Sequence, residues 1–170
     1  MPEVSSDATL IIATSWQALT RAETGDEKAM ICNCTVIIVF AAFYIEANLN
    51  QFIEKASGMD GIPTSPSEHA GLYKKLTWVY NSFVADEPIV DDEHLRTRLE
   101  DEFPGFLAIK NFRNNVSHGT IDRSVATLSK AKELRISAKA IVNRLLQIAT
   151  ENNIEIDRGI AYEVAISTTI

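Results

Sequence analysis

The stretch AMICNCTVIIVFAAFYI, residues 29–45, is the most apolar part of the 170-residue chain and decides its fold. Apart from Asn33 and Thr35 it is hydrophobic on every side of a helix. Asp26 and Glu27 precede it and suit a first helical turn, because carboxylates are favoured near a helix N-terminus. The pattern predicts a long helix over residues 26–55, buried on all sides at the centre of a bundle.

A membrane span is the alternative interpretation of this apolar run. Its 17 residues stand at the lower limit of the roughly 17–25 residues that cross a bilayer. The run is embedded in a longer helix, and no basic cluster at one end would set its orientation. We therefore expect a central bundle helix and no membrane association. Part of its apolar surface exceeds what one small bundle is expected to cover, which favours a dimer.

The remaining segments predict further helices joined by defined loops. Expected helices span about residues 7–23, 68–83 (capped by Ser67), 94–103, 106–119 and 123–150 (opened by Asp122 or Ser124), with loops at 56–66 and 84–94. On the last helix, six residues are expected on the core side: Val125, Leu128, Leu134, Ile141, Leu145 and Ile148. The fold class is therefore all-α: an up-and-down bundle of about four to six helices, two of them long, that dimerises. Residues 1–150 form one domain, and residues 151–170 form a tail whose structure the sequence leaves open.

Charge is unevenly distributed along the chain. The net charge of −7 excludes a protein whose whole surface is basic and binds nucleic acid nonspecifically. Residues 110–144 nevertheless hold eight of the 16 Lys and Arg residues against two acids, so this segment carries +6 and the remainder −13. The sequence predicts one basic region on an otherwise acidic protein.

Cysteines and acidic clusters give no sign of a metal or cofactor. Cys32 and Cys34 are two residues apart and thus on nearly opposite helix faces, so we expect two small buried hydrophobic side chains in a reducing compartment. The acidic loop at 84–94 lacks the glycine and the spacing of a calcium loop. No signal peptide is recognised, so a cytoplasmic location is expected.

Polar side chains that could take part in catalysis or binding are concentrated in the segment FRNNVSHG, residues 112–119. A helix ending in glycine commonly has a left-handed cap, and cations are favoured in its last turn, so capping alone is one interpretation. On a continuous helix, Arg113 and His118 lie roughly 140° apart. They cooperate only if the helix ends at the histidine or a second copy supplies the partner across an isologous interface.

The segment from Arg113 to His118 resembles the signature of the HEPN superfamily, an arginine followed after four to six residues by a histidine. Asn114 fits the polar residue that typically follows the arginine, and Gly119 is similar to many members. The layout is also similar over residues 7–150, with a long apolar helix ending in Glu46 and Asn50. The six-residue motif is the specific part of this resemblance.

The resemblance implies an all-α bundle that dimerises around a composite site. Many members are metal-independent endoribonucleases that serve as toxins, phage-defence effectors or RNA-processing enzymes, and others bind RNA or proteins without catalysis. A cognate antitoxin or a nucleotidyltransferase is a further partner that it suggests. Gly119 and Thr120 stand where one toxin subgroup has the tyrosine that a nucleotidyltransferase modifies, so that form of regulation is in doubt.

The residue types fit RNA cleavage without a metal. His118 would move protons, and Arg113 would grip the phosphate as negative charge develops. Asn114 would orient the histidine or the phosphate. Three further cations would guide the RNA backbone: Lys110, Arg123 and Lys130.

Glu46 and Asn50 are four residues apart and share a helix face. We expect one of them to form a hydrogen bond with a buried partner, Arg113 first, although a solvated helix end explains the pair equally well. The alternatives to a dimeric endoribonuclease are a noncatalytic RNA- or protein-binding module of the same fold and a purely structural interaction domain.

Overall fold

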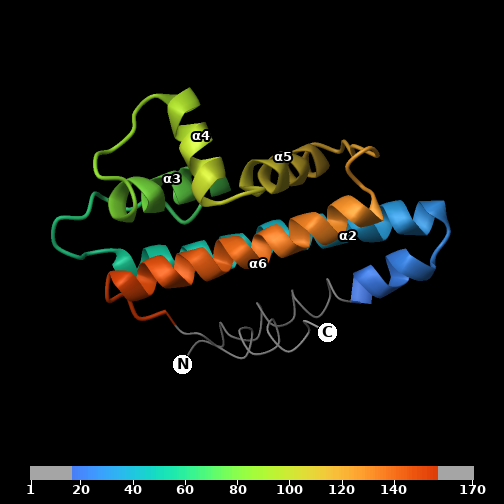
Figure 1. Ribbon diagram of the computed structural model, residues 1–170, viewed down its shortest axis with the longest axis horizontal. Coiled ribbons are helices and arrows are strands. Elements are labelled where there is room, and N and C mark those ends of the chain that lie inside the picture. The colour runs from blue at the N-terminus through green and yellow to red at the C-terminus, as the bar shows by residue number, and fades with distance from the viewer. Residues whose placement is uncertain (1–16, 157–170) are drawn as a thin grey trace.

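The computed structural model describes residues 17–156 and shows an all-α bundle (Figure 1). Two long helices, α2 (Glu27–Ala56) and α6 (Leu128–Glu151), pack along one another and run in the same direction. Helix α5 (Phe106–Ser117) packs against both and runs the opposite way, while α3 (Leu72–Phe83) and α4 (Asp92–Glu102) lie toward the C-terminal end of α2. Residues 17–24 are also helical, and the rest of the helix expected over 7–23 lies outside the described residues.

Helix α2 follows the predicted boundaries, but it is not buried on all sides. Asp26 is its N-cap and accepts a hydrogen bond from the Ala29 amide at 2.8 Å. Cys34 is buried, as expected, whereas Cys32 is exposed and Phe43 is 39 % exposed. The prediction failed because α3, α5 and α6 cover only part of the helix circumference.

In the described part of the chain, α2 is the one helix long and apolar enough to cross a membrane by length and composition. Within its most apolar window, 44 % of the residues are buried inside the protein. This is weak evidence for a membrane span, because the core helix of a soluble protein passes the same test.

Two short helices begin at other residues than their sequence predicts. Helix α3 starts at Leu72, after an N-cap at Gly71, because Ser67 instead accepts a hydrogen bond from the His69 amide in a preceding turn. Helix α4 starts at Asp92, with the Asp91 side chain accepting from the His94 amide at 2.7 Å. The end of the acidic run is therefore a helix N-terminus, where carboxylates are favoured, rather than loop.

Helix α6 begins later than predicted. Thr127 is its N-cap and accepts from the Lys130 amide at 3.3 Å. Asp122 instead accepts from the amide and hydroxyl of Ser124, and these hydrogen bonds hold the pKa of Asp122 below its ordinary value. Four of the six predicted core positions are confirmed as buried: Leu134, Ile141, Leu145 and Ile148. Leu128 is only partly buried, and Val125, also partly buried, lies before the helix begins. Ile154 is also buried, so packing continues past the helix, and residues 157–170 lie outside the described residues.

The start of α5 is fixed by close packing and by a capping carboxylate. Gly105 has φ +84°, and a Cβ there would lie 2.7 Å from the Ser137 hydroxyl of α6, so only glycine fits without a shift. Glu100 accepts hydrogen bonds from the amides of Gly105 (2.7 Å) and Leu107 (3.2 Å). These contacts set the position of the helix that carries the motif.

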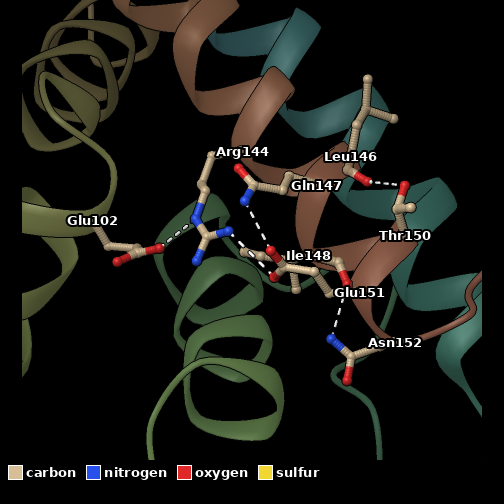
Figure 2. A network of polar contacts seen from close by, with 8 residues as sticks. All are labelled: Glu102, Arg144, Leu146, Gln147, Ile148, Thr150, Glu151 and Asn152. Carbon is tan, nitrogen blue, oxygen red and sulfur yellow. Dashed lines mark hydrogen bonds and ion pairs between the residues drawn. The ribbon is translucent and has the colours of Figure 1, made fainter.

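Arg144 ties the end of α4 to the last turns of α6 (Figure 2). Its Nε donates to Glu102, and its Nη1 lies 3.4 Å from a carboxylate oxygen of Glu151. Gln147 donates to the other Glu151 oxygen at 2.8 Å. One guanidinium therefore holds two carboxylates in place.

Candidate functional site

The motif segment forms the last turn of α5 and its cap. The His118 amide donates to the carbonyl oxygens of Asn114 and Asn115, both at 3.1 Å, and the Gly119 amide donates to Val116 at 2.9 Å. Gly119 has φ +79°, which confirms the predicted left-handed cap. The Ser117 hydroxyl also donates to the carbonyl oxygens of Arg113 and Asn114, both at 2.9 Å, and within residues 17–156 no hydrogen bond to the last carbonyl oxygens comes from the side chain of Arg113 or His118.

Arg113 points to α2 rather than to the helix end. Its Nη2 lies 3.6 Å from Oε2 of Glu46, and its Nη1 donates to the Asn114 side chain at 3.4 Å. The side chain of Arg113 is 32 % exposed. Arg113 is thus a partner of Glu46, but through an ion pair longer than a hydrogen bond and with a partly exposed side chain, not through the predicted hydrogen bond to a buried group.

Lys75 of α3 is a member of this site that the sequence did not suggest. Its Nζ lies 3.1 Å from Oε1 of Glu46, and its side chain is only 2 % exposed. One carboxylate of α2 therefore holds cations from α3 and α5, and the cluster keeps one positive charge in excess. Lys75 shares a helix face with Leu72 and Val79, and a lysine on that apolar face was the signal that could have revealed it.

Asn50 lies apart from these ion pairs. It is exposed, and with Lys75 it lines a cavity of about 330 Å³ between the C-terminal half of α2 and the segment that leads to α3. The Glu46 carboxylate, not the asparagine, is therefore the member of the predicted pair that contacts Arg113.

His118 is exposed where α5 ends, and its imidazole makes no hydrogen bond or ion pair with residues 17–156. Helix geometry places it roughly 140° around the axis and about 7.5 Å along it from Arg113. Arg113 meanwhile points toward the bundle and Glu46. A single chain does not bring the two side chains to one point.

The first predicted RNA guide, Lys110, packs on an aromatic ring. Its Nζ lies 5.4 Å from the centre of the Tyr73 ring, and the Arg96 guanidinium carbon lies 5.9 Å from the same centre. The Tyr73 hydroxyl donates to Asp92 at 2.9 Å. Burial, and then this hydrogen bond, raises the pKa of Tyr73.

The other two predicted guides lie elsewhere. Lys130 forms an ion pair with Glu133 one turn along α6, so its charge is already compensated. Arg123 is exposed and, with Lys28 and Cys32, lines a cavity of about 570 Å³ between the start of α2 and the α5–α6 connection. Of the three cations, only Lys110 lies on the helix that carries Arg113, one turn before it.

Among residues 17–156, no group of three or more His, Cys, Asp or Glu side chains is placed to hold a metal ion.

Comparisons with known proteins add no information on this site. No family model matches the sequence, and comparisons with curated proteins and with solved structures found no match either.

Proposed function

We propose that this protein is a cytoplasmic, metal-independent endoribonuclease of the HEPN type, acting on RNA through a composite Arg/His site at a homodimer interface. The observation that carries the proposal is the Glu46 cluster, in which one carboxylate meets two cations. Excess positive charge around a partly exposed arginine suits a phosphate. An exposed histidine that the fold does not use follows five residues later.

Each side chain has a defined role in this reaction. His118 takes the proton of the 2′-hydroxyl or gives one to the leaving 5′-oxygen. Arg113 binds the phosphate oxygens as charge develops on them. Asn114 contacts the Arg113 guanidinium and orients it. Attack by the 2′-oxygen on phosphorus releases the 5′-hydroxyl fragment and leaves a 2′,3′-cyclic phosphate.

A second copy of the chain is part of the proposal. Arg113 and His118 are separated within one chain, and a two-fold axis beside α5 would bring Arg113 of one protomer toward His118 of its partner. As a toxin or phage-defence protein, the dimer would be controlled by a cognate antitoxin.

The second candidate is a noncatalytic RNA- or protein-binding module. One observation favours it: within one chain Arg113 contacts Glu46 while His118 is exposed at the end of α5, and binding through Arg113 needs no assembled Arg/His pair. This candidate predicts RNA retention without cyclic-phosphate products.

The two candidates are separated by cleavage of single-stranded RNA in EDTA by the H118A variant. Loss of a general acid or base lowers the rate by about 10²–10⁴-fold, while the oligomeric state in sedimentation should not change. H94A is the matched control, because His94 is an exposed histidine on α4 outside the motif. Cleavage by H118A at the rate of the H94A control would refute the endoribonuclease.

A further inference from the structure

Glu46 divides its two carboxylate oxygens between two unlike cations. Oε1 lies 3.1 Å from Nζ of Lys75, and Oε2 lies 3.6 Å from Nη2 of Arg113. The side chain of Lys75 is 2 % exposed, whereas that of Arg113 is 32 % exposed. One contact is buried and short, and the other is long and open to solvent.

The two ion pairs differ in the free energy that is lost when each is broken. A buried ammonium that loses its counter-charge is strongly destabilising, so Lys75 must stay with Glu46. A half-exposed ion pair at 3.6 Å lies beyond ordinary hydrogen-bond distance and contributes little. Arg113 can therefore leave Glu46 for another anion, while Glu46 remains neutralised by Lys75.

We propose that Lys75 is a positioning residue, which neutralises Glu46 and thereby leaves Arg113 available to an RNA phosphate. The inference deepens the proposed function and rests on it. Without Lys75, Arg113 alone would balance Glu46, and a phosphate that approached Arg113 would meet an uncompensated carboxylate. Lys75 acts in this way without touching the RNA.

Three variants separate charge from packing. K75M keeps an unbranched, apolar side chain in the buried position but removes the charge. K75R restores the charge, and the double variant E46Q/K75M removes the carboxylate as well, so that nothing competes with RNA for Arg113.

The binding experiment uses a single-stranded RNA whose 2′-O-methyl groups block cleavage, at one fixed salt concentration. K75M should weaken binding about two- to fivefold, the range expected of a half-exposed ion pair. K75R should bind like the wild type, and E46Q/K75M should recover wild-type affinity. Wild-type binding by K75M, or an E46Q/K75M variant as weak as K75M, overturns the inference.

A second measurement needs no RNA. In urea unfolding, R113M should lower the midpoint more in the K75M background than in the wild type, because Glu46 there has only Arg113. If R113M shifts the urea midpoint equally in the two backgrounds, Glu46 is not shared between Lys75 and Arg113, whatever the protein binds. A wild-type protein that neither binds nor cuts RNA refutes the proposed function instead, and the urea cycle still decides whether Glu46 is shared.

Discussion

Two ion clusters join the helices of this bundle, and they differ in the sign of the charge in excess. Arg144 on α6 meets two carboxylates, Glu102 from α4 and Glu151 from its own helix (Figure 2). Glu46 on α2 meets two cations, one from α3 and one from α5. The first cluster has a negative charge in excess, and the second a positive one.

This difference separates a structural arginine from an available one. Arg144 is held by two carboxylates, so a phosphate near it would be repelled by the remaining negative charge. Arg113 shares its carboxylate with a buried lysine, so a phosphate near it gains a partner without leaving Glu46 unpaired. Both clusters contain an arginine and a carboxylate, and the number of cations relative to carboxylates decides which role the arginine can take.

Replacing each arginine in turn with methionine should give the largest difference between the two clusters, in the rate of RNA cleavage. R113M should lower RNA cleavage by about 10²–10³-fold, because a donor to the developing phosphate charge is lost. R144M should leave the cleavage rate per folded molecule within about twofold, since its excess charge does not suit phosphate. The measurement is the initial rate on single-stranded RNA, and equal losses in the two variants would contradict the distinction.

Removing the shared carboxylate should give the largest loss of stability. E46Q leaves Lys75 buried without a counter-charge and should lower the free energy of unfolding by about 2–4 kcal/mol. E102Q is the control, because Arg144 keeps its contact with Glu151, and it should lose about 1 kcal/mol or less. Urea unfolding measures both, and an E46Q variant as stable as E102Q would show that Lys75 does not depend on Glu46.

Arg144 should matter for stability alone. R144M leaves Glu102 partly buried without its cation and should lower the free energy of unfolding by about 1–2 kcal/mol. Unfolding in urea at low and at high salt checks this value, because salt screens a partly exposed pair. A variant with wild-type stability would mean that the Arg144 cluster does not fasten α4 to α6.

The smallest effect concerns the cap beside the Arg113 cluster. G119A introduces a Cβ at φ +79°, where nothing lies within 4 Å, so strain alone should cost about 1 kcal/mol. G105A is the matched comparison: its φ is also positive, and its Cβ would lie 2.7 Å from the Ser137 hydroxyl, so it should lose more. Thermal unfolding ranks the two, and equal losses would contradict close packing at Gly105.

Much of the fold could be predicted from apolar periodicity. The long helices α2 and α6 and the cap at Gly119 follow directly from local pattern. The start of α3 could not be predicted so well, because Ser67 is as suitable for a turn as for a helix cap. The exposure of Phe43 could not be predicted either, since it depends on which helices pack around α2.

The site was predicted in part. Arg113 was expected as a partner of Glu46 or Asn50, although it lies 67 positions from Glu46, but a long ion pair was not expected. Lys75 was missed because a lysine is usually exposed, and its burial is tolerated only because Glu46 lies beside it. In the proposed site His118 meets Arg113 of a second chain, and no pattern within one chain can position that partner.

The central claim, a site built from Arg113 of one protomer and His118 of its partner, is tested most directly by mixing two inactive variants. R113M and H118A are mixed in equal amounts under conditions that allow subunits to exchange, and RNA cleavage is measured. A mixed dimer holds one complete site, so the mixture should recover about a quarter of wild-type activity. A mixture as inactive as either variant alone would contradict the composite site.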